Sequence, residues 1–161
     1  MLRTTIMLLA LALSLQVTRA AAAQDGDSLS ERIADTIKVY EANWVLETSK
    51  THPYSEMLKY RALFFDWKYE KYYVTAEVLL HSTEEDAALT LKNANIKERR
   101  KGEVSPSNVR GLGDDAYEWK GAGVYYEDCG YYFRKGKAVV LINSSSKLVA
   151  KRFAMLIAKQ L

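Results

Sequence analysis

The segment from Gly111 to Leu161 constrains the fold more than any other part of the chain. It begins with a glycine-rich turn and an aromatic strand, and it turns again at Lys135-Gly136, where glycine tolerates a positive φ angle. The next strand contains Val139–Ile142, a continuous apolar run that predicts a central, well-covered strand. Serines at 144–146 then favour a helix N-cap. The predicted terminal helix presents an apolar face made of Val149, Phe153, Leu156, Ile157 and Leu161.

A second segment with the same order of elements precedes this one. Two β-rich runs, Tyr60–Trp67 and Tyr72–Leu80, flank a polar turn and predict a hairpin. The second run alternates wetter positions with apolar ones, which is typical of an antiparallel strand with one buried face. The capping-box sequence Ser82–Glu85 then predicts a helix over about Thr83–Arg100.

The two segments align as a weak internal repeat. Val78–Leu80 match Val140–Ile142, which lie 62 positions further along the chain. Each half consists of strand, turn, strand and capped helix, although any two β-then-α segments look alike at this level. We therefore predict an α+β fold in which an N-terminal helix, about Leu29–Glu47, is followed by two β-β-α units. The two units share one antiparallel sheet, with the helices packed on one face.

Four shorter stretches complete the predicted layout. Thr48–Ser55 and Gly102–Asn108 are interpreted as loops, because each contains a proline. A third strand is predicted over about Asp115–Lys120. Val124–Glu127 is a candidate for a short further strand, and a turn is expected at Asp128–Gly130.

The first 23 residues have the features of a signal peptide. Arg3 gives a positive start, and Ile6–Leu15 is an apolar run that is too short for a stable membrane span. Small residues at Ala20–Ala23 offer a cleavage site before Gln24. An N-terminal membrane anchor is the alternative interpretation. We expect residues 24–161 to form a single exported domain that is periplasmic or secreted.

The charge of the exported part argues against a dedicated nucleic-acid binder. Loss of Arg3 and Arg19 with the signal peptide reduces the 23 basic residues to 21, against 20 acidic residues. Nucleic-acid-binding domains usually carry a marked basic excess. No acidic residue follows Asp128, however, so the C-terminal segment is basic. Either this segment attracts the acidic remainder of the fold, or it attaches to an anionic membrane surface through Lys147, Lys151, Arg152 and Lys159.

Few residues are suited to catalysis or metal binding. The chain has two histidines, His52 and His81, and one cysteine, Cys129, which offer no convergent ligand set and no internal disulfide. We expect no cofactor or metal, and Cys129 is interpreted as a buried structural residue. The enzymatic alternative is a small hydrolase or transferase that uses Asp114 or Asp115 with His81. The same two carboxylates also suit a turn, where they would accept backbone hydrogen bonds.

Aromatic side chains offer a candidate recognition surface. Tyrosine pairs at 72–73, 125–126 and 131–132 place one ring on each face of their strands. If no helix covers the second face, an aromatic platform lies open there, and such surfaces bind sugars, peptides or partner proteins. The alternative is that the N-terminal helix covers that face. The candidate binding residues are Tyr117, Trp119, Tyr132 and Arg134.

Three pieces of the chain resemble known proteins. The turn Gly111–Tyr117 (GLGDDAY), the hairpin Phe133–Val140 (FRKGKAVV) and the terminal helix resemble small exported bacterial domains of uncharacterised function. The region Tyr60–Leu161 is also distantly similar to the extracellular sensor domains of some bacterial Ser/Thr kinases. Because these motifs are structural rather than catalytic, the resemblance implies a fold and a location.

The favoured function is therefore an exported, non-enzymatic binding or accessory domain. Two observations motivate it: no catalytic motif can be recognised in the sequence, and the tyrosine pairs supply a surface for recognition. We expect the partner to be an envelope protein or a glycan, bound through the aromatic sheet face and its basic edge.

Overall fold

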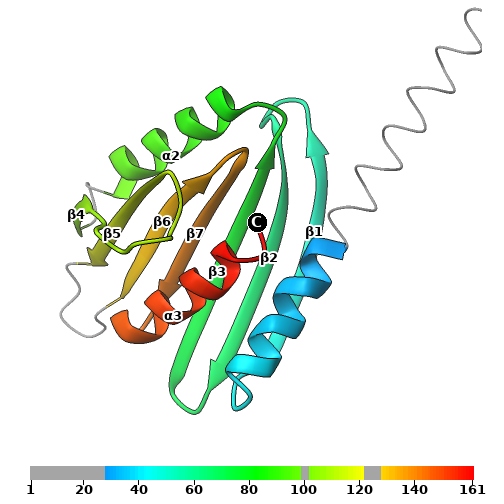
Figure 1. Ribbon diagram of the computed structural model, residues 1–161, viewed down its shortest axis with the longest axis vertical. Coiled ribbons are helices and arrows are strands. Elements are labelled where there is room, and N and C mark those ends of the chain that lie inside the picture. The colour runs from blue at the N-terminus through cyan, green and yellow to red at the C-terminus, as the bar shows by residue number, and fades with distance from the viewer. Residues whose placement is uncertain (1–27, 99–101, 122–127) are drawn as a thin grey trace, which may run out of the picture.

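The computed structural model of the chain describes residues 28–98, 102–121 and 128–161. The predicted signal peptide, residues 1–23, lies outside the described residues, and so does the candidate strand Val124–Glu127. None of the described helices is long and apolar enough to cross a membrane. The described residues form three helices and one antiparallel sheet (Figure 1).

The sheet of the described residues has seven strands in the order β1-β2-β3-β7-β6-β5-β4. Every neighbouring pair is antiparallel. The strands are β1 (Val45–Ser55), β2 (Tyr60–Tyr69), β3 (Tyr72–His81), β4 (Gly102–Pro106), β5 (Asp115–Gly121), β6 (Cys129–Lys135) and β7 (Ala138–Ser144). β7 lies in the middle of the sheet, which confirms that the apolar run Val139–Ile142 forms a central strand.

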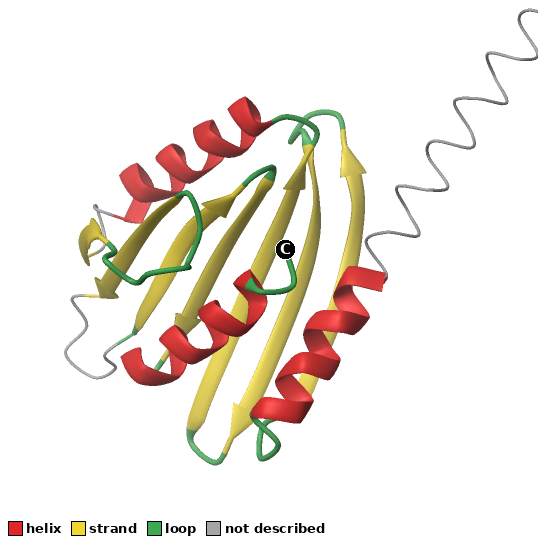
Figure 2. Ribbon diagram, in the orientation of Figure 1, coloured by secondary structure: helices red, strands yellow, loops and turns green. Residues whose placement is uncertain are grey.

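The three described helices are divided between the two faces of the sheet (Figure 2). The N-terminal helix covers residues 28–40, α2 covers Glu84–Glu98, and α3 covers Lys147–Ala158. The N-terminal helix and α3 pack on one face, which we call the α3 face. α2 packs on the opposite face, which we call the α2 face.

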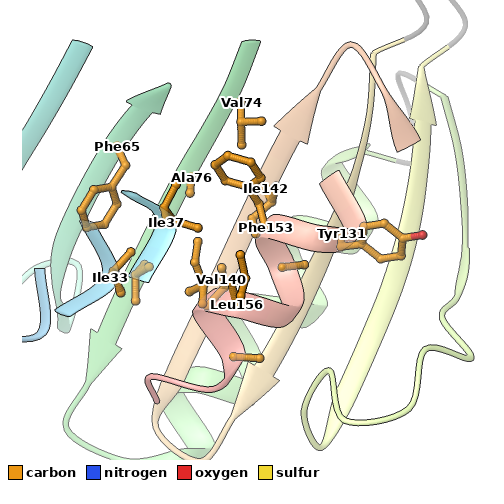
Figure 3. Packing of buried hydrophobic residues seen from close by; sticks show 14 of the residues in the cluster. Ile33, Ile37, Phe65, Val74, Ala76, Tyr131, Val140, Ile142, Phe153 and Leu156 are labelled. Atoms are coloured by element: carbon orange, nitrogen blue, oxygen red, sulfur yellow. The ribbon is translucent and has the colours of Figure 1, made fainter. Parts of the chain in front are cut away.

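The α3 face holds the larger hydrophobic cluster. Ile33 and Ile37 of the N-terminal helix and Phe153 of α3 pack over Phe65 of β2 and Val140 of β7 (Figure 3). All five side chains are fully buried. Ile33 and Ile37 are one helical turn apart, which is the spacing that places apolar residues on one face of a helix. Burial of this apolar stripe holds the N-terminal helix on the sheet.

The α2 face holds a smaller cluster. Ala87 and Leu91, one turn apart on α2, pack with Leu79 of β3, Val139 of β7 and Tyr132 of β6. All of these side chains are buried. The prediction that the helices pack on one face of the sheet is therefore wrong, since α2 lies on the face opposite to α3.

The face that each helix covers follows from the last residue of the strand before it. Val78 of β3 pairs with Val140 of β7, so the predicted repeat of 62 positions matches the register at the centre of the sheet. β3 ends at His81, whereas β7 ends at Ser144, which is 63 positions further along. Because side chains alternate between the faces of a strand, this one-residue difference directs α2 and α3 to opposite faces.

Two stretches predicted to be loops are the edge strands of the sheet. β1 contains Pro53 and β4 ends at Pro106, and proline predicts a loop because it cannot donate to a strand ladder. An edge strand tolerates proline, because one of its sides has no partner strand. Pairing with β2 begins at Val45, so the N-terminal helix ends at residue 40 rather than at Glu47.

The other predicted elements agree with the structure apart from their ends. Gly136 adopts a φ angle of 56° in the turn between β6 and β7, as predicted. β6 begins inside the predicted turn Asp128–Gly130, and α3 ends at Ala158 rather than at the last residue. A Cβ atom on Gly130 would lie 1.8 Å from the carbonyl oxygen of Ile142, so the absence of a side chain there lets β6 approach β7.

Replacement of Phe153 by alanine tests the packing of α3. The Phe153 ring is fully buried, and its centroid lies 5.1 Å from the ring of Trp44 and 5.2 Å from that of Trp67. We expect the free energy of unfolding, measured by urea denaturation, to fall by about 3–5 kcal/mol. Met155→Ala on the same helix is the control, because Met155 is 36% exposed. Equal losses in the two variants would contradict this packing.

Candidate functional site

A cleft of about 580 Å³ opens between α2 and the sheet. Strands β2, β3 and β7 form its floor, and α2 forms a wall. The residues that line it include Tyr60, Phe64, Asp66, Thr75, Glu77, Leu79, Thr90, Asn93, Ala94, Lys97, Tyr132, Leu141 and Asn143. The size of the cleft and its mixture of apolar and polar groups suit a small molecule.

The floor of the cleft follows from the alternation in β3. Val74, Ala76 and Val78 of this strand face the α3 side and are buried, so Thr75 and Glu77 between them face the cleft. In the sheet register, Glu77 lies opposite Phe64 of β2 on one side and Leu141 of β7 on the other. A carboxyl group is therefore set between two apolar side chains on the floor.

A stripe of polar and small residues on α2 forms the wall. Ala87 and Leu91 hold the helix on the sheet, and both are buried. The stripe lies beside them, at the i, i+3, i+4 and i+7 positions that share one face of a helix. It consists of Thr90, Asn93, Ala94 and Lys97. α2 therefore offers hydrogen-bonding groups to the cleft instead of closing it with apolar side chains.

Glu77 has an altered acidity. Burial raises the pKa of its carboxyl above the ordinary value, and the positive charge of Lys97 opposes part of this rise. Burial acts in this direction because desolvation disfavours the charged form. Among the described residues, no hydrogen bond or close ion pair joins this carboxyl to another group. A desolvated carboxyl inside a concave site is a candidate for a binding residue.

Three of the four predicted binding residues lie together on the α2 face. Tyr117 is opposite Tyr132 in the register, and the rings of Trp119 and Tyr132 stack at a centroid distance of 6.3 Å. Tyr132 lines the cleft, and its hydroxyl donates a hydrogen bond to Oδ1 of Asn143 at 3.0 Å. α2 packs on Tyr132 and leaves it only 4% exposed, whereas Tyr117 and Trp119 of β5 are half-buried. The rings therefore form a partly covered layer beside the cleft, and α2 is the helix that packs on Tyr132.

Arg134, the fourth predicted residue, is held by ion pairs. Its guanidinium lies 3.1 Å from the carboxylates of Asp114 and Asp115 and 3.7 Å from that of Glu84. The carboxylate of Asp114 also accepts a hydrogen bond from the backbone N–H of Gly136 at 2.9 Å. These contacts fix the start of β5 to the turn between β6 and β7. They agree with the interpretation of the two aspartates as turn residues.

His81 has other contacts. Its Nδ1 lies 3.0 Å from the carbonyl oxygen of Lys59, and its ring packs against the ring of Tyr60 at a centroid distance of 5.2 Å. Burial lowers the pKa of the imidazole. Within the described part of the chain, no hydrogen bond or ion pair joins His81 to Asp114 or Asp115. The arrangement therefore gives no support to a reaction that uses these three residues together.

Acidic partners neutralise part of the basic surface of α3. Lys147 pairs with Glu118 of β5, and this contact raises the pKa of the lysine. Arg152 pairs with Glu41, which follows the N-terminal helix, at 2.9 Å. These pairs support the interpretation that the C-terminal segment attracts acidic parts of the same fold. The other two predicted cations, which are exposed, are Lys151 and Lys159.

Cys129 is buried at the start of β6. Its Sγ donates a hydrogen bond to the carbonyl oxygen of Ser144 at 3.4 Å. These contacts agree with the predicted structural role of the thiol. In the part of the chain that the structure describes, no group of three or more histidine, cysteine, aspartate or glutamate residues is placed to hold a metal ion.

Apart from Tyr132, the cleft residues were not predicted as site residues. Two signals for them are nonetheless present in the sequence. The alternation in β3 marks Thr75 and Glu77 as residues that face a wetter side. The polar stripe between Thr90 and Lys97 interrupts the apolar pattern of α2. No local pattern indicates, however, that α2 crosses the sheet face to which Glu77 points.

Comparisons with known proteins bear on the fold. No model of a protein family matches the chain, and no curated protein matches it. Among solved structures, the fold is similar to that of the extracellular domain of PknH from Mycobacterium tuberculosis, with a TM-score of 0.56. The match covers 79% of this chain and 89% of that chain, at 10% sequence identity. At this identity the likeness concerns the fold alone, and at that level it supports the predicted distant similarity to an extracellular domain.

Replacement of Glu77 by glutamine tests the environment of the carboxyl. Because its pKa in the folded state is raised above the reference value of 4.5, ionisation of Glu77 destabilises the fold as the pH rises through the folded pKa. The stabilising effect of the neutral carboxyl is thus complete below pH 4.5 and is lost when the pH exceeds the pKa of the folded state. We expect Glu77→Gln to have a higher Tm than the parent at neutral pH and a similar Tm at about pH 4.

The control is Glu103→Gln, because Glu103 is exposed on the edge strand β4. Thermal unfolding of the three proteins, followed by circular dichroism between acidic and neutral pH, gives the comparison. A difference in Tm between Glu77→Gln and the parent that does not change with pH would show that the carboxyl lacks the raised pKa.

Proposed function

We propose that the chain is an exported, non-enzymatic domain that binds a small ligand in the cleft beside α2. Ligand sites are typically concave, with apolar and aromatic surfaces and a few convergent polar groups. In this cleft, Phe64, Tyr132 and Leu141 supply the apolar and aromatic surface, and Glu77 and Lys97 supply charge. The observation that carries the proposal is the partly buried carboxyl of Glu77 on the floor.

The chemistry of the floor favours a ligand with an ammonium group. Glu77 has lost part of its hydration, and no close partner among the described residues replaces the lost water. A ligand ammonium would supply a charge-assisted hydrogen bond at that point. Asp66, which is opposite Thr75 in the register, adds a second carboxyl to the floor. Two acidic residues and one lysine give the lining a net negative charge, which attracts cations.

The residues beside Glu77 define the rest of the ligand. Phe64 and Leu141 flank the carboxyl in the neighbouring strands, so the part of the ligand next to the ammonium group is expected to be apolar. Thr90 and Asn93 on the wall can hydrogen-bond polar groups that point toward α2. An aryl- or alkylammonium compound fits this combination.

Two observations support the exported location. The first 23 residues have the composition of a signal peptide. The solved structure with a similar fold is the extracellular domain of another protein. A fold of this kind thus exists outside the cell, where the proposed domain would meet its ligand.

The predicted binding residues have supporting roles in this proposal. Tyr117 and Trp119 pack beside Tyr132 and position it at the cleft. Arg134 secures the turn between β6 and β7 through its ion pairs, so it acts on the ligand only through the fold. Tyr132 is the member of this group that we expect to touch the ligand.

A pair of matched probes, 2-phenylethylamine and 2-phenylethanol, tests the function. The two compounds share a ring and a chain and differ in the ammonium or hydroxyl group. We expect the amine to shift the amide signals of Thr75, Glu77 and Asn93 in a ¹H–¹⁵N NMR titration at neutral pH. We also expect the Kd of the amine to be about tenfold lower than that of the alcohol, because charge-assisted hydrogen bonds are the stronger ones.

Two variants serve as controls for this titration. Glu77→Gln should remove the preference for the amine, because it removes the charge and keeps the shape of the side chain. Glu103→Gln should keep the preference, because Glu103 does not line the cleft. Equal affinities for the two probes in the parent protein, or an unchanged preference in Glu77→Gln, would refute the proposal.

A further inference from the structure

A second cavity, of about 450 Å³, lies on the α3 face. It opens where the end of the N-terminal helix, the hairpin between β2 and β3, and the first turns of α3 meet. None of its lining residues lines the cleft beside α2. Its aromatic lining consists of Tyr40, Trp44, Tyr69 and Tyr72.

The fold holds these rings in place from two sides. Tyr69 and Tyr72 are opposite each other in the register that closes the hairpin, so both side chains project to the same face. Trp44 is nearly buried, and its ring centroid lies 5.9 Å from that of Tyr69 with an angle of 47° between the planes. Tyr40 is 69% exposed at the end of the N-terminal helix. The cavity therefore has a fixed aromatic wall and one exposed ring.

The charged groups of the cavity compensate each other. Glu41, whose side chain is only 11% exposed, pairs with Arg152 of α3 at 2.9 Å. These two are the charged residues of the lining, so its net charge is zero. Asn43 and Ser146 add neutral polar groups, and the Ser146 hydroxyl makes no cap hydrogen bond to α3. The cavity thus offers donors and acceptors without an excess of either charge.

We propose that this cavity binds a neutral oligosaccharide. Sugar rings present C–H faces that pack on aromatic side chains, and their hydroxyls both donate and accept hydrogen bonds. Tyr69 and Tyr72 provide aromatic faces. Arg152 donates hydrogen bonds and Glu41 accepts them. The ion pair can therefore bind sugar hydroxyls both as acceptors and as donors.

Other classes of ligand fit this cavity less well. Arg152 would repel a cationic ligand and Glu41 would repel an anionic one. The ion pair leaves neither charge in excess to attract either kind of ligand. A purely apolar ligand would cover the ion pair and remove water from its remaining donors and acceptors, which costs free energy. The neutral lining also separates this cavity from the cleft beside α2, which has a net negative charge.

Tryptophan side-chain signals report on the cavity directly. Trp44 lines it, whereas Trp67 and Trp119 do not, so the indole N–H signals of ¹⁵N-tryptophan-labelled protein separate this site from the rest. The probes are the neutral sugars cellotetraose, tetra-N-acetylchitotetraose and maltotetraose. We expect at least one of them to shift the Trp44 signal. No shift with any of the three at about 10 mM, where a sugar with a millimolar Kd would be bound, overturns the proposal.

Tyr40→Ala and Tyr54→Ala form a matched pair of variants. Both tyrosines are exposed, by 69% and 44%, so neither replacement removes core packing. Tyr40→Ala should weaken sugar binding by about twofold to tenfold, which is the value of one aromatic contact, and Tyr54→Ala should not change it. Equal affinities in the two variants would overturn the proposal.

Glu77→Gln separates this proposal from that of the α2 cleft. Because Glu77 does not line the aromatic cavity, sugar binding should be the same in Glu77→Gln and in the parent. The preference for an amine should be the same in Tyr40→Ala and in the parent, because Tyr40 does not line the cleft. Each site can therefore fail its own test while the other passes. Sugar binding that is weakened by Glu77→Gln and not by Tyr40→Ala would overturn the assignment of the sugar to this cavity.

Discussion

The pairing of β3 with β7 is the contact on which the rest of the structure depends. It joins the two β-β-α halves through one ladder, in which Val78 is opposite Val140. Both valines are fully buried on the α3 face. Because side chains alternate along a strand, this register decides at once which residues of the two central strands face α3 and which face α2. A slip of one residue would exchange the two sets on the strand that slipped.

The division of the helices between the two faces produces two sites of different chemistry. On the α2 face one helix covers part of a broad sheet, and its polar stripe borders a cleft with Glu77 on the floor. On the α3 face two helices share the sheet, and an aromatic cavity lies where they meet the hairpin of β2 and β3. The cleft has a negatively charged lining, whereas the Glu41–Arg152 pair neutralises the cavity. Different ligands are therefore expected at the two sites.

Most of the fold, and part of the site, could be predicted from local patterns. The apolar run Val139–Ile142 identified the central strand, and alternation in β3 marked Glu77 as facing a wetter side. The edge strands could not be predicted, because Pro53 and Pro106 are compatible with a strand only once its place at the edge is known. The cleft exists because α2 follows His81, which faces the side of the sheet opposite to Ser144 at the end of β7. The two strands end 63 positions apart, and the predicted repeat of 62 positions gave no sign of this one-residue difference.

Nuclear Overhauser effects between side chains of the helices and the sheet test most directly whether α2 and α3 lie on opposite faces. We expect contacts from the methyl groups of Leu91 to those of Leu79 and Val139, and contacts from the ring of Phe153 to Val140. Contacts from Leu91 to Val140 in place of Val139 would put α2 on the α3 face. That result would contradict the account of the fold and remove the cleft that holds Glu77.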